Sequence, residues 1–242
     1  MISEAFCCII LNRKNPKQEG YAVIEVKKLT KKFGSHTAVD GISFTVNDGE
    51  ILGFLGPNGA GKTTTMNMMT GFISSTEGEV KINGFDILSD PINAKRQLGY
   101  LPDVPPLYGD LTVEENLKFV CDLKGVKKSD RKEMLEEICR IVHIEDVYKR
   151  LFKNLSKGYR QRVGLAQALV GFPDVIILDE PTNGIDRNGL KDVHEIIKEE
   201  KNKDKIILLA SHDLDDLNLL CDEIYFIENG RIKDSSEEIS ND

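Results

Sequence analysis

Residues 56–64 combine glycine, lysine and threonine in an order that suits phosphate binding. They fit the pattern Gly-x-x-x-x-Gly-Lys-[Ser/Thr]. Glycines at a strand-to-helix turn let consecutive backbone N–H groups converge on an anion. Lys62 would then reach the β- and γ-phosphates of a nucleotide, and the Thr63 hydroxyl would bind Mg²⁺. The alternative is a glycine-rich turn without a ligand. The candidate nucleotide-binding residues here are Gly56, Pro57, Asn58, Gly59, Ala60, Gly61, Lys62, Thr63 and Thr64.

Two acidic residues, Asp179 and Glu180, directly follow the apolar run 175–178. Unpaired carboxylates at the end of a buried strand are costly, so a nearby cation is expected. In an open α/β sheet, the carboxyl ends of parallel strands border the ligand crevice. We therefore expect Asp179 to hold Mg²⁺, directly or through water, and Glu180 to polarise an attacking water. The open alternative is that both acids end the strand in solvent.

One histidine has a comparable position. His212 comes shortly after the apolar run 206–210, where it could hydrogen-bond a γ-phosphate. The remaining histidines are expected on the surface or in loops and are given no role: His36, His143 and His194.

A second candidate anion site lies at Ser156 and Gly158, which open a predicted helix. A helix N-terminus offers free N–H groups, and the serine adds a hydroxyl. Taken alone, this segment fits an ordinary N-capped helix equally well.

The elements that position these residues follow from apolar patterning. Continuous apolar runs such as 206–210 are typical of parallel strands buried on both faces. The turn signal Asn47-Asp48-Gly49 predicts a hairpin between the strands that flank it. Helical patterns alternate with the later strands, so an α/β layered core is predicted. The expected strands cover 22–26, 42–46, 51–55, 79–82, 175–178, 206–210 and 223–227.

The middle of the chain, from about 113 to 171, has a helical pattern and no convincing strand. Thr112 is predicted to cap one helix, with acidic residues suited to its first turn. Ser129 is predicted to cap a second helix, and 127–132 is interpreted as a solvated turn.

Composition narrows the class of protein. The chain has 242 residues, 40% hydrophobic and 30% charged, which is typical of a globular protein of one domain. Its net charge of −8 argues against nonspecific binding of nucleic acid. The five cysteines include no Cys-x-x-Cys pair, so neither a disulfide framework nor a zinc site is predicted. The odd number and scattered spacing of the cysteines fit a reducing cytosol best, so a cytoplasmic protein is expected. No apolar run is long enough to span a bilayer.

Together these motifs resemble the ATPase subunit of an ATP-binding cassette (ABC) transporter, from about residue 24 to 232. Residues 56–63 match the Walker A loop, and 175–179 with Glu180 match Walker B and the catalytic glutamate. Residues 155–159 occupy the family signature, 183–186 the loop after Walker B, and His212 the switch histidine. Phe33 stands where the family places an aromatic ring that stacks on adenine. An ordinary buried phenylalanine at a strand end is the alternative for that residue.

The chain departs from the family pattern at three positions. The signature, commonly Leu-Ser-Gly-Gly-Gln, has Lys157 for its first glycine and Tyr159 for glutamine. Ser156 and Gly158 are retained, so phosphate binding is expected to survive with altered strength. Asp103 stands where the family usually has glutamine. A carboxylate can still ligate Mg²⁺, but it cannot donate a hydrogen bond while ionised.

The resemblance implies an α/β fold with a P-loop NTPase core, an N-terminal antiparallel β part and an inserted helical subdomain at about 104–171. The ATPase domain would cover 23–242, and 1–22 would be a poorly ordered extension. The family pattern also assigns roles: Glu180, His212 and Lys62 in catalysis, and Thr63, Asp103 and Asp179 at the metal.

The same resemblance implies partners. Two cassettes would sandwich ATP and Mg²⁺ between residues 56–63 of one and Ser156 and Gly158 of the other. A separate transmembrane permease would carry the cargo, and residues 100–108 look most like exporter-type cassettes. The cassette would then lie on the cytoplasmic face of the membrane. The alternatives are a soluble cassette protein acting on nucleic acid or ribosomes, and an ATP sensor that does not hydrolyse.

Overall fold

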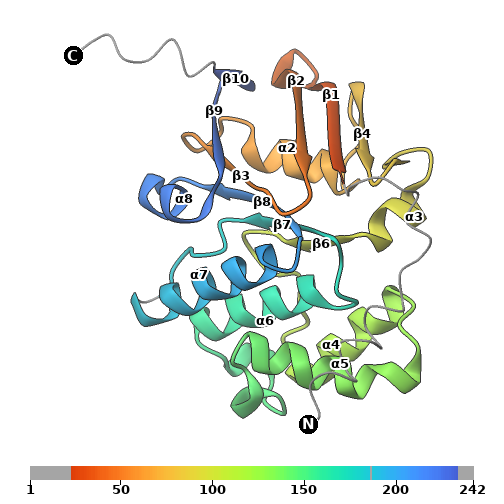
Figure 1. The fold of residues 1–242 in the computed structure, drawn as a ribbon, viewed down its shortest axis with the longest axis vertical. Coiled ribbons are helices and arrows are strands. Elements are labelled where there is room, and N and C mark those ends of the chain that lie inside the picture. The colour runs from red at the N-terminus through yellow and green to blue at the C-terminus, as the bar shows by residue number, and fades with distance from the viewer. Residues whose placement is uncertain (1–22, 186, 234–242) are drawn as a thin grey trace.

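The computed structural model describes residues 23–185 and 187–233 (Figure 1). The predicted extension at 1–22 and residues 234–242 lie outside the described residues, as does Asp186 in the loop matched to the family. Two sheets with helices on either side make up the fold, which confirms the predicted α/β class with an N-terminal antiparallel part.

The larger sheet has six strands in the order β10-β9-β3-β8-β7-β6. The strands from β9 to β6 run parallel, and β10 pairs antiparallel with β9. Its central strands are continuous apolar runs because both of their faces are covered. The strands are β3 (Ile51–Leu55), β6 (Leu98–Leu101), β7 (Val175–Asp179), β8 (Ile206–Ser211), β9 (Glu223–Glu228) and β10 (Arg231–Lys233).

The smaller sheet is antiparallel, in the order β2-β1-β4-β5. Its longest pair, β1 and β2, closes in a tight turn in which Phe33 and His36 are paired. Its strands are β1 (Val23–Phe33), β2 (His36–Asn47), β4 (Glu77–Ile82) and β5 (Phe85–Asp86).

The hairpin predicted at Asn47-Asp48-Gly49 is wrong. A turn does form there, with the Glu50 amide donating to the Asn47 carbonyl at 3.2 Å. However, β2 before it pairs with β1 of the small sheet, and β3 after it lies between β8 and β9 of the large one. The reason is burial: every residue of β3 except the last is buried, which an open hairpin could not provide.

The helices cover the large sheet on both faces. One core lies between the small sheet, α2 (Lys62–Met69) and one face of the large sheet, and it includes Met66 and Ile177. The other lies between the opposite face and α6 (Lys157–Leu169) with α7 (Arg187–Lys201), and it includes Val163 and Ile176. In Figure 1, α2 and the small sheet lie above the large sheet, with α6 and α7 below it. Two short helices complete this part, α3 (Pro91–Arg96) and α8 (Leu214–Leu220).

Between β6 and β7 the chain forms α4 (Val113–Leu123), α5 (Lys128–Ile141) and short 3₁₀ turns at Glu145–Val147 and Phe152–Asn154 before α6. Thr112 caps α4 as predicted, in a reciprocal capping box with Glu115. The predicted cap at Ser129 is wrong, because α5 already begins at Lys128. The predicted solvated turn at 127–132 is therefore mostly helix.

Strand β6 was not predicted from the sequence, because it is short and contains Gly99. The structure explains that glycine, since an added Cβ atom would lie 2.2 Å from the Ala168 carbonyl oxygen of α6. Strand β6 positions part of the candidate site, because it ends at Leu101, two residues before Asp103.

Candidate functional site

The phosphate-binding candidates connect β3 to α2, as the pattern predicted. Two glycines are required there by geometry. Gly61 has φ of +110°, a left-handed conformation that side chains disfavour. At Gly56 an added Cβ atom would lie 2.2 Å from the Ile227 carbonyl oxygen. The loop can therefore turn sharply against β9, a geometry in which backbone amides can converge on an anion.

Lys62 is the first residue of α2 and is only 6% exposed. Its ammonium donates to the Gly56 carbonyl at 2.6 Å and lies 3.4 Å from that of Pro57. The side chain thus folds back over the loop, which holds a positive charge next to the converging amides.

Asp179, the last residue of β7, is fully buried. Burial raises its pKa to about 6, which the nearby Glu180 and Asp103 carboxylates support and the Thr63 hydroxyl and Lys62 ammonium oppose. Neither carboxylate oxygen has a hydrogen-bond partner of ordinary geometry. A buried carboxylate without donors, close to a threonine hydroxyl, is the oxygen ligand set that fits Mg²⁺.

Within residues 23–185 and 187–233, three or more His, Cys, Asp or Glu side chains nowhere gather into a metal cluster. The oxygens of Asp179 and Thr63 would be two of the ligands of Mg²⁺, a metal that usually keeps several waters and binds substrate phosphates.

Glu180 follows Asp179 in a left-handed conformation, with φ of +52°. Such strain in a residue other than glycine is retained where the surroundings impose it, often at functional sites. Its Oε2 atom lies 2.8 Å from Nδ1 of His212, which follows the neighbouring strand β8. The Glu180 side chain is 13% exposed and that of His212 is 63% exposed. The pair is therefore open to a ligand on the cavity side.

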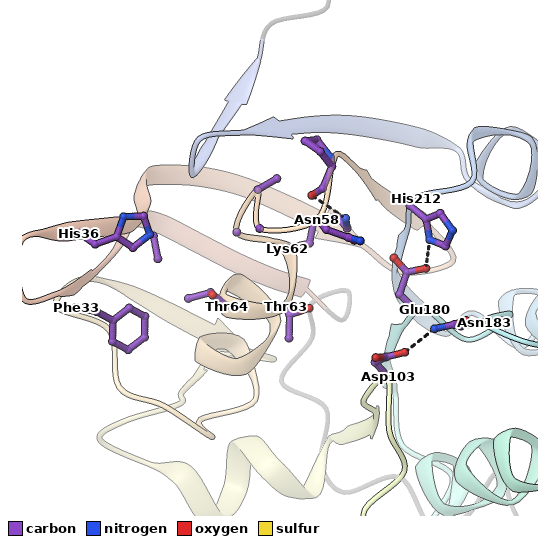
Figure 2. Close-up of a pocket in the computed structure, with 15 residues that line it drawn as sticks. Phe33, His36, Asn58, Lys62, Thr63, Thr64, Asp103, Glu180, Asn183 and His212 are labelled. Atoms are coloured by element: carbon purple, nitrogen blue, oxygen red, sulfur yellow. Dashed lines mark hydrogen bonds and ion pairs between the residues drawn. The ribbon is translucent and has the colours of Figure 1, made fainter. Parts of the chain in front are cut away.

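Most of these residues line one cavity of about 500 Å³, whereas Gly56 and the fully buried Asp179 are not part of its lining. Figure 2 shows Phe33 and His36 at one end, Lys62 and Thr63 in the middle, and Glu180, His212, Asp103 and Asn183 at the other. Of the predicted residues, the lining includes Phe33, Pro57, Asn58, Gly59, Ala60, Gly61, Lys62, Thr63, Thr64, Asp103, Glu180 and His212.

Phe33 is not an ordinary buried phenylalanine, since it is 52% exposed at the end of β1. The structure adds three lining residues that the sequence analysis did not name as site residues: His36, Ala38 and Asn183, the last within the predicted loop at 183–186. His36 is exposed, as expected, but it was given no role. Its pairing with Phe33 across a two-residue turn brings both side chains to the same face. The Phe-Gly-Ser-His spacing could have revealed this.

Ser156 and Gly158 do not reach this cavity. Ser156 caps α6, with its hydroxyl accepting from the Tyr159 amide at 3.3 Å. Nothing lies within 4 Å of a Cβ atom added at Gly158. The predicted second anion site is thus an open helix N-terminus, separate from the phosphate loop of its own chain.

A glycine-rich loop with a buried lysine, a buried acid and a paired glutamate at the ends of parallel strands are the features of a nucleotide hydrolase of the P-loop class. Residues 39–183 match the ABC transporter family. The chain belongs to this family and is the ATP-binding, ATP-hydrolysing subunit of an ABC transporter.

Two relatives support this assignment. The chain is 39% identical over 214 residues to the uncharacterized ABC transporter ATP-binding protein YhcH of Bacillus subtilis, covering 88% of this chain and 69% of the relative. It is 37% identical over 211 residues to the bacitracin transport ATP-binding protein BcrA of Bacillus licheniformis, covering 87% and 68%.

Among solved structures, the dimeric structure of MJ0796, a bacterial ABC transporter cassette, aligns with a TM-score of 0.80 at 25% identity. The alignment covers 87% of this chain and 97% of that one.

Proposed function

We propose that this cassette hydrolyses Mg²⁺-bound ATP in a head-to-tail pair of cassettes and thereby drives export through a separate transmembrane permease. The observation that carries the proposal is the separation of the two anion sites. Ser156 and Gly158 open to solvent, outside the cavity formed by their own phosphate loop. A second cassette can therefore supply these groups to the nucleotide, so that ATP binding assembles the complete site.

Within each cavity, the roles follow from position. The loop amides and Lys62 bind the phosphates, and Phe33 offers its exposed ring to the adenine. Thr63 and Asp179 would hold Mg²⁺, with Asp103 at the edge of the same cavity. The metal would neutralise charge that develops on the phosphates. Glu180 takes the proton of the attacking water, and His212 orients the Glu180 carboxylate.

The described residues 23–185 and 187–233 contain no helix long and apolar enough to cross a membrane. We place the passage for the cargo in the proposed transmembrane permease. The proposed location of the cassette is the cytoplasmic face of the membrane, where ATP is available.

The proposed contact with the permease is the start of a helical subdomain at 104–171, within an ATPase domain of 23–242. Apolar side chains are exposed there, with Val104 at 76% and Tyr108 at 56%. Tyr108 also packs edge to face on Phe119, with the ring centroids 5.6 Å apart. Exposed apolar side chains that form a contiguous patch mark protein–protein interaction sites, whereas single exposed apolar residues are ordinary.

Crosslinking tests the proposal. A photoreactive amino acid at Val104 in the native cell should crosslink to a membrane protein with several spans, and one at the exposed Lys132 of α5 should not. In parallel, Glu180→Gln with ATP should favour a cassette dimer that Ser156→Arg prevents. Crosslinks exclusively to RNA would overturn transport in favour of a nucleic-acid role. A variant that stays monomeric with saturating ATP would overturn the sandwich.

A further inference from the structure

Helix α6 presents one face to the loops that border the nucleotide cavity. Lys157, Gln161 and Gly164 share that face at helical spacing. The buried Gln161 side chain donates to the Glu180 carbonyl at 3.2 Å. Further along, a Cβ atom added at Gly164 would lie 2.6 Å from the Leu101 side chain at the end of β6. This face of α6 is therefore packed against both the Glu180 loop and the end of β6, from which the backbone continues to Asp103.

Lys157 begins a short polar chain across this contact. Its ammonium donates to Oδ1 of Asn183 at 3.3 Å, and Nδ2 of Asn183 donates to Oδ1 of Asp103 at 2.9 Å. Figure 2 shows the second of these bonds at the edge of the cavity. The Asn183 amide thus uses its oxygen toward a cation and its nitrogen toward an anion, so it connects the two charges.

The loop is shaped to receive the lysine. Gly184 has φ of +72°, and a Cβ atom added there would lie 2.2 Å from Nζ of Lys157 and 2.5 Å from its Cε atom. The whole end of the lysine side chain therefore rests on the glycine backbone. A larger residue at 184 would displace Lys157 and break its bond to Asn183.

The hydrogen bonds from Lys157 through Asn183 to Asp103 connect the N-terminus of α6 with the nucleotide cavity. Asp103 and Asn183 line the nucleotide cavity, whereas Lys157 follows Ser156 at the open N-terminus of α6. Lys157 and Asp103, two of the three departures from the family pattern, are the two ends of this series of hydrogen bonds. An ionised Asp103 cannot donate a hydrogen bond and needs a donor. The Nδ2 atom of Asn183 supplies that donor, and the Lys157 ammonium donates to the Oδ1 atom of the same Asn183 side chain.

We propose that Lys157 is a positioning residue that acts through Asn183 to hold Asp103 at the metal side of the nucleotide cavity. The N-terminus of α6 and the cavity of the same chain are thereby coupled, so that a ligand at one end alters the other. This inference rests on the proposed function in one respect, the placement of Asp103 near Mg²⁺.

The test measures the Mg²⁺ concentration needed for half-maximal binding of ATP, in Lys157→Met, Asp103→Ala and the double variant. Methionine keeps the apolar stem over Gly184 and removes the ammonium. Each single change should raise that concentration by about two- to fivefold, as expected for a partly exposed charge-assisted bond. The double variant should resemble Asp103→Ala alone, because both changes act on one chain of contacts.

Three further variants separate positioning from general structure. Lys157→Arg should need nearly the same Mg²⁺ concentration for half-maximal ATP binding as the wild type, since arginine retains a cationic donor. In an Asn183→Ala background, Lys157→Met should have no additional effect. Lys153 forms an ion pair of 2.6 Å with Asp110, and neither residue lines the cavity. The control variant Lys153→Met should therefore leave the Mg²⁺ dependence of ATP binding unchanged. Thermal unfolding of each variant checks folding, and Lys157→Gln replaces Lys157→Met if that variant unfolds.

Independent, multiplicative effects of Lys157→Met and Asp103→Ala would overturn the coupling. So would an unchanged Mg²⁺ dependence in either single variant. Failure of the proposed function has a different signature, because ATP binding would then be insensitive to Lys62→Ala and to Mg²⁺ in the wild type.

Discussion

The Nδ1 atom of His212 lies 2.8 Å from the Oε2 atom of Glu180, although the two residues are 32 positions apart. Parallel pairing of β7 with β8 brings them together, with Asp179 opposite Ala210. The Glu180 amide continues that pairing by donating to the Ala210 carbonyl at 2.9 Å. The carboxylate is therefore held at a fixed place beside the phosphate loop before any ligand arrives.

Replacing Glu180 by glutamine should separate binding from chemistry. The amide keeps the shape of the side chain but cannot accept the proton of the attacking water. We expect turnover to fall by roughly 10²–10⁴-fold with ATP affinity nearly unchanged. Phosphate release and ATP titration measure the two quantities. Glu136→Gln, on the exposed face of α5, is the matched control. Near-wild-type turnover in Glu180→Gln would remove Glu180 from the role of base.

Replacing Lys62 by alanine should weaken nucleotide binding itself. The ammonium is the buried cation of the phosphate loop, and charge-assisted hydrogen bonds of this kind contribute about 1.5–3 kcal/mol each. Calorimetric titration with ATP should show an affinity reduced by at least tenfold. Lys128→Ala, an exposed lysine at the start of α5, should bind ATP normally. Equal affinities in the two variants would contradict the phosphate-loop assignment.

Asp179→Asn should stabilise the protein without nucleotide at neutral pH. Because burial raises the pKa of Asp179 to about 6, the folded chain binds this proton more tightly than the unfolded chain. Wild-type stability therefore falls as the pH rises from about 4 to 6 and stays lower above that range, by about 1–3 kcal/mol.

Urea unfolding of wild type and variant at several pH values checks this expectation. The advantage of Asp179→Asn should be largest at pH 7 and vanish near pH 4. Asp110→Asn alters an exposed carboxylate and should show no such gain. An Asp179→Asn variant less stable than wild type at pH 7 would contradict the conclusion that burial of the Asp179 carboxylate lowers the stability of the folded chain.

Phe33→Ala should reduce affinity for ATP and leave affinity for tripolyphosphate unchanged. The ring is half exposed at one end of the cavity, and stacking of a base on an aromatic ring contributes about 1–3 kcal/mol. Competition binding with both ligands makes the comparison, and Phe33→Tyr should behave like wild type. If the affinities for ATP and for tripolyphosphate fell equally, the Phe33 ring would contribute to phosphate binding and not to stacking on adenine.

The sequence by itself determined the chemistry and much of the framework. The glycine, lysine and threonine spacing at 56–64 and the acids after an apolar strand depend on local backbone geometry, so they can be read along the chain. The same holds for the cap at Thr112 and for the continuous apolar runs of β7 and β8.

The tertiary structure decided which elements lie side by side. The turn at Asn47-Asp48-Gly49 joins two different sheets because β3 needs cover on both faces, which no local signal reports. The spacing of Lys157, Asn183 and Asp103 along the chain gives no hint of their contact. That contact exists because α6 packs across the ends of β6 and β7, and such packing depends on the whole core.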